Sequence, residues 1–225
     1  MAIARNFHHL HPNPVKREWA LVRFGVLIPF LAILSLTVGC VSTMRAQSSR
    51  PVRVEPLDII LQTDAASFGL ANLGVFPFMT PHYAVGAGKE VTDFYLAELL
   101  RVGMFRQLTL IPHFVKTDEE AVWWGRRQGC DLVMKSEITY LMDGSGGMPT
   151  HLQTSIRIID VRSGMPRWNL RQKAYSEPGP DVDLVWTTIS GSPAQRYRLL
   201  ARSLAEQLSE YFNSSAASQA KTYKK

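Results

Sequence analysis

The feature that most constrains this chain is an apolar run that ends at a cysteine. Residues 24–38 carry no charge, and the basic residues Lys16, Arg17 and Arg23 precede them. Gly39 then stands directly before Cys40 in the segment LTVGC. A basic start, an apolar stretch of roughly 7–15 residues and a small residue are the parts of a secretory signal. The sequence therefore predicts export of the residues that follow.

This segment resembles the lipobox of bacterial lipoproteins. The resemblance implies that residues 1–39 are a signal peptide and that Cys40 is acylated and becomes the first mature residue. The family usually has Leu three places before the cysteine, where this chain has Thr37. An uncleaved membrane helix over residues 19–38 is the alternative, because about 20 apolar residues span a bilayer. Val41 after the cysteine implies the periplasmic face of the outer membrane, with the inner membrane as the alternative.

Charge and motifs exclude several classes of function. The formal charge is +6, and four basic residues against one acidic residue in the predicted signal peptide leave +3 for the rest. This net positive charge is small, and the basic residues do not form a stripe along the sequence. We therefore expect no nucleic-acid partner. The cluster His8, His9 and His11 lies in the signal peptide, and the other histidines are widely spaced. No metal, nucleotide or hydrolase motif occurs. We therefore expect no enzyme, no metal, no cofactor and no small-molecule substrate.

The second cysteine, Cys130, has no predicted disulfide partner if Cys40 is acylated. Free cysteines are among the most often buried residues, so core packing is the expected role. A reactive thiol is the alternative.

The first half of the exported part alternates strands and helices. Leu57–Thr63 is a possible strand, and Leu70–Phe78 is apolar on both faces, as a buried strand should be. Helical periodicity covers Lys89–Val102, with Gly103 as its C-cap. Arg106–Phe114 is again a predicted strand. A second helix begins at the capping box of Thr117 and Glu120 and ends at Gly129.

The second half predicts an antiparallel meander followed by a last helix. Short turns separate three strands, at Asp131–Leu141, His151–Val161 and Arg167–Tyr175. Ser176–Gly191 contains prolines and glycines and is predicted to be a long surface loop. Ser192 and Pro193 then have the pattern of an N-cap and a first helical residue, with Gln195 completing a box.

This order of elements predicts an α/β fold. The segments LGVFPF, EVTDFYLAELLRVGMFRQLTLIP, EEAVWWGRRQGCDLVMKSEITY and SIRIIDVRSGMPRW are similar to the N-terminal domain of the translocation protein TolB. Curli-secretion and Pel-export lipoproteins share the pattern. The resemblance implies one three-layer-like domain over residues 57–213, with a mixed sheet, a C-terminal antiparallel meander and about three helices. Residues 40–56 are then a tether, and residues 214–225 a disordered basic tail.

The same resemblance implies an accessory of envelope assembly or of secretion and export. Such a protein works by contacts with an envelope protein or with copies of itself, and with the membrane through the lipid on Cys40. Membrane-crossing hairpins need about 9–11 residues per strand, so the short turns of this chain predict a peripheral component and not a pore. A monomeric adaptor that regulates a periplasmic enzyme, such as a cell-wall synthase, is the alternative function.

Two tryptophans are the predicted contact residues. Trp186 lies in the loop Ser176–Gly191, and tryptophan is enriched at the energetic centres of protein interfaces. Trp123 is the second candidate, with Arg126 and Arg127 as a polar rim. The alternative is that the apolar residues of the loop cover the base of the last helix.

Overall fold

The computed structural model describes residues 51–63, 70–144 and 147–222, with side chains through residue 215. The predicted signal peptide, Cys40 and most of the predicted tether lie outside these residues. In chain order the elements are β1 (Arg53–Val54), β2 (Asp58–Gln62), β3 (Asn72–Val75), α2 (Ala87–Val102), β4 (Gln107–Leu110), α3 (Asp118–Arg127), β5 (Leu132–Met142), β6 (Thr150–Asp160), β7 (Pro166–Ser176), β8 (Val182–Leu184), β9 (Thr187–Ile189) and α4 (Tyr197–Thr222).

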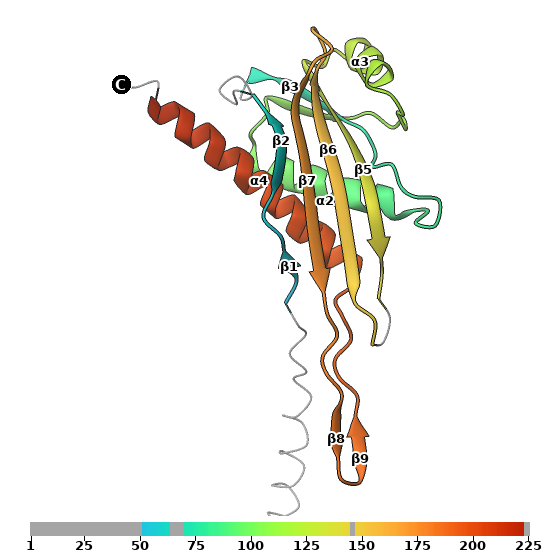
Figure 1. The fold of residues 1–225 in the computed structure, drawn as a ribbon. Coiled ribbons are helices and arrows are strands. Elements are labelled where there is room, and N and C mark those ends of the chain that lie inside the picture. The colour runs from blue at the N-terminus through green and yellow to red at the C-terminus, as the bar shows by residue number, and fades with distance from the viewer. Residues whose placement is uncertain (1–50, 64–69, 145–146, 223–225) are drawn as a thin grey trace, which may run out of the picture. The chain divides into compact units, whose positions relative to one another are not determined.

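Seven strands form one mixed sheet in the order β1-β7-β6-β5-β3-β4, and β2 also pairs with β7 (Figure 1). Strand β3 lies between β4 and β5 and is parallel to both. The three strands β5, β6 and β7 run antiparallel, as the predicted meander requires. The predicted mixed α/β fold is therefore confirmed.

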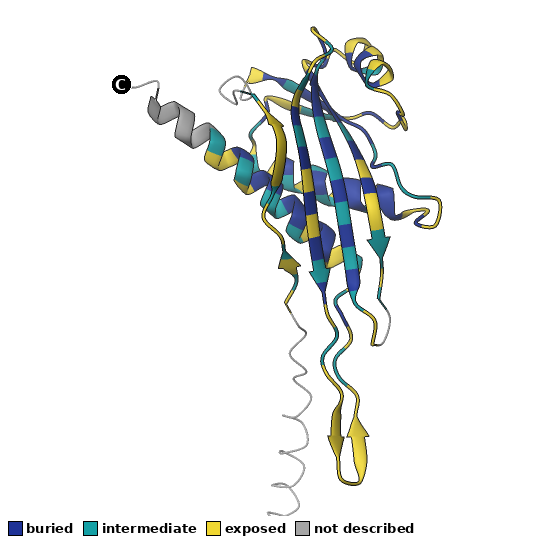
Figure 2. Ribbon diagram, viewed as in Figure 1, coloured by how far each residue is buried: buried dark blue, intermediate teal, exposed yellow. Residues whose placement is uncertain are grey.

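The alternation of side chains along β6 gives the sheet two different faces. Leu152, Ile156 and Ile158 are fully buried on one face, whereas Gln153 and Ser155 are partly exposed on the other (Figure 2). Successive side chains of a strand point to opposite sides, so one face of the meander belongs to the core and the other is polar.

Helices α2 and α4 cover the buried face together and lie behind the sheet in Figure 1. The buried hydroxyl of Tyr95 in α2 donates to Gln172 Oε1 of β7 at 2.8 Å. Gln172 Nε2 then donates to the carbonyl oxygen of Leu204 in α4, also at 2.8 Å. Because buried polar groups need partners, this chain of hydrogen bonds fixes both helices against one strand.

Helix α3 covers the other face at one end of the sheet only. It packs on a separate buried cluster that includes Phe76, Val133 and Val161. Gly125 makes this approach possible, because a Cβ atom there would stand 2.6 Å from Val133 Cγ1. The sheet therefore has three layers at this end, and its polar face is uncovered by α3 toward the other end.

The start of α3 confirms the predicted cap. Thr117 Oγ1 accepts a hydrogen bond from the backbone N–H of Glu120 at 3.2 Å. Glu120 Oε2 accepts from the backbone N–H of Lys116 at 2.9 Å, one residue before the expected donor. At the other end of the helix, Gly129 has φ 66° and the N–H of Cys130 bonds to the Gly125 carbonyl oxygen. These bonds form a Schellman motif, so Gly129 ends the helix as predicted.

The predicted cap at Ser192 is wrong, because α4 begins at Tyr197. Residues 192–196 instead run from the preceding loop to the helix, and Ala194 is buried on the way. The backbone N–H of Gln195 donates to Ser176 Oγ at 2.9 Å, which holds this segment to the end of β7. The local pattern resembles a cap, but the helix begins five residues later, after the buried Ala194.

Three further elements differ from the expectation. Residues 53–54 of the predicted tether form β1, which pairs with Tyr175 and Ala174 of β7. Helix α4 continues through Thr222, so the predicted unstructured tail is helical up to that residue. The predicted surface loop 176–191 contains the hairpin of β8 and β9.

Candidate functional site

The hairpin of β8 and β9 projects away from the body of the domain (Figure 1). Val182 pairs with Ile189 and Leu184 with Thr187, which leaves Val185 and Trp186 as a two-residue turn. Paired residues of a ribbon lie on the same face. One face of the hairpin therefore carries three aliphatic side chains, and the turn adds a valine and a tryptophan.

All of these apolar side chains are exposed to solvent. Trp186 is 83% exposed and Val185 is 94% exposed. The opposite face is polar, since the hydroxyl of Thr188 donates to Asp183 Oδ1 at 2.8 Å. The alternative that the loop covers the base of the last helix is therefore wrong. The sequence hypothesis for Trp186 requires an accessible side chain, and the structure provides one.

The base of the hairpin is held as a narrow neck. The backbone N–H of Gly179 donates to the Ser192 carbonyl oxygen at 2.7 Å, and that of Gly191 donates to Asp181 Oδ1 at 2.8 Å. A Cβ atom on Gly191 would lie 2.1 Å from the Gly179 carbonyl oxygen. The two backbone segments at the base of the hairpin are therefore too close together to admit a side chain at this position. These contacts hold the two backbone segments of the neck side by side, so that the hairpin leaves the domain as a two-stranded ribbon.

The hairpin and the incoming chain share one end of the sheet. β1 begins at Arg53, opposite Tyr175, and β7 ends at Ser176 immediately before the neck. β1 and β7 are antiparallel. The chain before Arg53 and the chain after Ser176 therefore leave the sheet in the same direction.

The second group of candidates lies at the opposite end, on α3. Trp123 is 49% exposed, and the Arg127 guanidinium lies 4.8 Å from its ring centroid. The neighbouring Trp124 is partly buried and stacks on His113, with 3.7 Å between ring centroids. The structure thus brings Trp123 and Arg127 together. Arg126 points elsewhere, because its Nε donates to the Val161 carbonyl oxygen at 3.2 Å.

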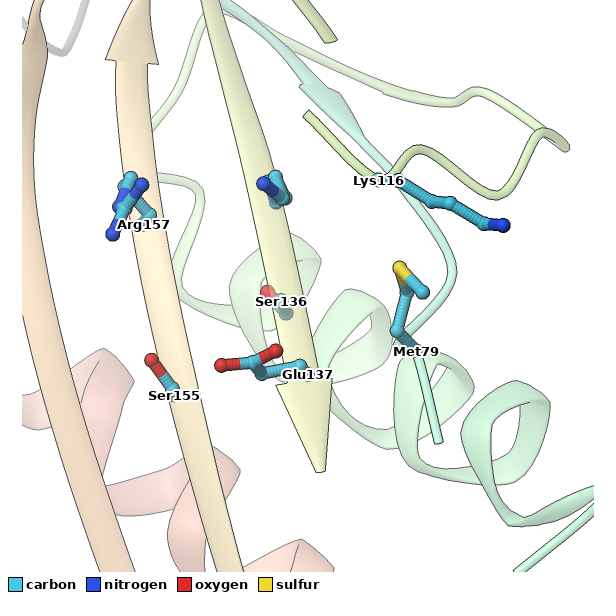
Figure 3. Close-up of a pocket in the computed structure, with 7 residues that line it drawn as sticks. Met79, Lys116, Ser136, Glu137, Ser155 and Arg157 are labelled. Carbon is cyan, nitrogen blue, oxygen red and sulfur yellow. The ribbon is translucent and has the colours of Figure 1, made fainter. Parts of the chain in front are cut away.

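The polar face of the sheet carries two adjoining shallow depressions of about 310 and 330 Å³. Glu137 and Ser155 line both depressions, and Figure 3 shows these two side chains with Arg157 in the first of them. Asp118 of α3 accepts hydrogen bonds from Lys135 at 2.9 Å and from Arg157 at 2.7 Å. Sequence reasoning missed this ion cluster, since its members are far apart in the chain.

These partners favour the ionised form of Asp118. Partial burial raises the pKa of its carboxyl, but the hydrogen bonds from Lys135 and Arg157 outweigh that effect and hold the pKa below its usual value. The cluster joins α3 to β5 and β6. Its two cations are therefore already paired, and this arrangement stabilises the α3 layer.

A metal site and a reactive thiol each place demands on the His, Cys, Asp and Glu side chains of the described residues. Within residues 51–63, 70–144 and 147–222, no group of three or more histidine, cysteine or acidic side chains is placed to hold a metal ion. The thiol of Cys130 is buried, and burial together with the Asp131 charge raises its pKa. A thiol with a raised pKa is a poor nucleophile. Cys130 also packs in the cluster beneath α3, which agrees with the expected core role.

No helix among the described residues is long and apolar enough to span a membrane.

The fold defines a small α/β domain with exposed aromatic side chains at both ends of one mixed sheet. The chain matches no protein-family model and no curated protein sequence. Solved structures that align with it include the PelC dodecamer from Paraburkholderia phytofirmans, at 16% identity and a TM-score of 0.47 over 70% of this chain and 92% of that chain.

Two further solved structures are similar to a smaller part of the chain. Lipoprotein GNA1162 from Neisseria meningitidis has 16% identity and a TM-score of 0.38 over 48% of this chain and 83% of that chain. The LpoB C-terminal domain from Salmonella enterica has 18% identity and a TM-score of 0.37 over 49% of this chain and 86% of that chain. PelC and lipoprotein GNA1162 are thus among the solved structures that align with this chain.

Proposed function

We propose that this protein is a lipid-anchored accessory of the bacterial envelope that works by binding proteins, not by catalysis. The segment LTVGC supports acylation of Cys40 and removal of residues 1–39. Val41 supports the periplasmic face of the outer membrane. The accessory belongs to envelope assembly or to secretion and export.

The observation that carries the proposal is the exposed apolar surface of the hairpin. Isolated two-stranded hairpins are marginal in water, and large exposed apolar groups on a projection usually mark a contact site. Trp186 is the expected anchor, because tryptophan buries a large area at little cost in conformational entropy. Val185 and Leu184 lie beside it in the turn and the adjoining strand.

The hairpin would act near the membrane. Residues 41–52 connect the predicted lipid to β1, and a chain of this length reaches at most about 40 Å at ~3.3 Å per residue. The hairpin leaves the same end of the sheet. This shared end supports a contact surface that faces the membrane, within reach of a neighbouring copy or an envelope protein.

The proposal is tested with Trp186→Ala in the full-length protein, expressed in a bacterial envelope. Met165→Ala is the matched control, since Met165 is 64% exposed but lies in the β6–β7 turn at the opposite end. We expect Trp186→Ala to reduce in-cell cross-linked complexes at least tenfold while the melting temperature stays unchanged. Equal complexes in both variants would contradict the role of the hairpin.

The mass of the cross-linked species separates the two functional classes. Multiples of the mature chain would indicate an oligomeric accessory. A one-to-one product with a cell-wall synthase or another periplasmic enzyme would indicate the adaptor.

Lipidation has its own test. Cys40→Ser is expected to accumulate as an unprocessed precursor, and mass spectrometry of the wild-type protein should find acylated Cys40 as its first residue. An intact Met1 on the wild-type protein would contradict this assignment.

A further inference from the structure

The mixed sheet has an open edge at each side. Within the described residues, β2 pairs with β7 alone and β4 pairs with β3 alone. An edge strand presents unpaired backbone N–H and C=O groups, whose complement is another extended strand. Both edges are therefore chemically suited to strand addition.

The β2 edge carries an exposed run of aliphatic side chains. All five residues of β2 are exposed, and Ile59, Ile60 and Leu61 are consecutive aliphatic residues. Ile60 is 49% exposed and lies at a register shift, where it has no partner in the β7 register. Natural edge strands commonly carry lysine or proline to prevent pairing, and β2 contains neither.

The two edges run in opposite directions. β4 is parallel to β3 and β3 is parallel to β5, so β4 has the direction of β5. β6 is antiparallel to β5, and β7 is antiparallel to β6, so β7 has the direction of β5. β2 is antiparallel to β7 and therefore has the opposite direction. β2 and β4 are therefore antiparallel across the sheet.

The proposed lipid anchor restricts how copies of the chain meet. Copies that stand on one membrane face with the β1 end of the sheet toward the tether have their strands pointing the same way. Under this condition, β2 of one copy meets β4 of the next in the antiparallel sense. Pairing of β2 with β2, or of β4 with β4, would be parallel, which is the less stable arrangement.

We propose that the β2 edge of one copy pairs with the β4 edge of a second copy, so that the sheet continues from copy to copy. The contact joins two different surfaces and leaves one free edge on each outer copy. Such a contact builds rings or open chains of more than two copies. This inference rests on the proposed membrane anchor and adds a surface that is separate from the hairpin.

The test uses pairs of cysteines in the full-length protein in its oxidising compartment. Opposed residues of antiparallel strands have Cα atoms about 4.5–5.5 Å apart, which is within disulfide range. The pairs are Ile60→Cys with Thr109→Cys, and Ile60→Cys with Leu110→Cys, which together sample neighbouring registers. We expect one pair to give a ladder of dimers, trimers and larger species that disappears on reduction.

The controls distinguish the possible occupants of the edge. Ile60→Cys with Leu199→Cys pairs the edge with an exposed position on α4 and should give no ladder. Dimers from Ile60→Cys alone would indicate symmetric pairing of β2 with β2 and would overturn the proposal. An adduct of Ile60→Cys with a different protein would overturn it in favour of a partner's strand.

Absence of any ladder would also overturn the proposal, provided that both variants melt like the wild-type protein. The hairpin is tested separately, because Trp186→Ala leaves both edges intact. Loss of complexes in Trp186→Ala without a β2–β4 ladder would keep the contact function and reject the continuous sheet.

Discussion

Asp143, which directly follows strand β5, caps the start of helix α4. Its Oδ1 accepts a hydrogen bond from the backbone N–H of Tyr197 at 3.1 Å. The first N–H groups of a helix have no partner within the helix, so a carboxylate at this place both accepts a bond and faces the positive end of the helix dipole. The β5–β6 turn and the last helix are therefore linked directly.

Asp143→Ala is expected to lower the free energy of unfolding by about 1 kcal/mol, the usual value of a lost cap. Ser192→Ala is the matched comparison, because Ser192 precedes the helix start by several residues. Urea denaturation of both variants measures the loss in the free energy of unfolding for each. A larger loss for Ser192→Ala would place the helix start at the sequence-predicted cap.

Thr117→Ala is expected to cost a similar amount, about 1 kcal/mol, since it removes the acceptor for the Glu120 N–H. Thr117→Ser keeps a hydroxyl acceptor and should lose less. Equal urea midpoints for the alanine variant and the wild-type protein would contradict the cap.

Asp118 makes part of the stability dependent on pH. Its pKa in the folded state lies below its ordinary value of 3.8. A depressed carboxyl pKa contributes stability above the unfolded pKa and loses it as pH falls through the folded pKa. We expect the free energy of unfolding of the wild-type protein to fall more steeply below about pH 4 than that of Asp118→Asn. Acid denaturation of both proteins, followed by urea melts at each pH, measures this difference.

The close approach of α3 to the sheet makes Gly125 sensitive to size. A methyl group there would stand 2.6 Å from Val133 Cγ1 and 2.8 Å from Val161 Cγ2. Gly125→Ala is expected to destabilise the domain by about 1–3 kcal/mol, the range for overpacking. Gly147→Ala meets nothing within 4 Å and should change little. Comparison of the thermal midpoints of the two variants tests whether the Gly125 position is sensitive to size.

Trp168 and Trp186 should differ in how much stability their truncation costs. Trp168 is fully buried beside Phe212, so Trp168→Ala is expected to cost about 3–5 kcal/mol. Trp186 is exposed, so Trp186→Ala should leave the denaturation midpoint within about 0.5 kcal/mol of the wild-type value. A loss above about 3 kcal/mol at Trp186 would assign it to a packed environment.

Much of the fold follows from patterns that act over short distances. The alternation along β6 predicts both its strand and its two faces, and Thr117 and Gly103 mark helix ends because their local chemistry is sufficient there. Trp123 and Trp124 differ in exposure for the same reason, since adjacent helical residues point in different directions. The core positions of these elements were therefore predictable.

The hairpin and the start of α4 were not predictable in this way. β8 and β9 are three residues each, which is too short for alternation to stand out between prolines and glycines. Ser192 has the local chemistry of a cap, but its segment is held extended by tertiary contacts. Asp143 caps α4 from 54 positions away, and no pattern in one sequence encodes such a distance.

The pairing of β1 with β7 has a mechanical consequence for an anchored domain. A pull on the chain at Pro51 acts along the axis of β1, because β1 lies antiparallel to the end of β7. The bonds between these strands, with that from the Glu55 N–H to the Lys173 carbonyl oxygen at 2.9 Å, lie across the direction of the pull. They are therefore strained together in shear and do not open one after another, so tension from the membrane reaches the sheet before the chain peels away.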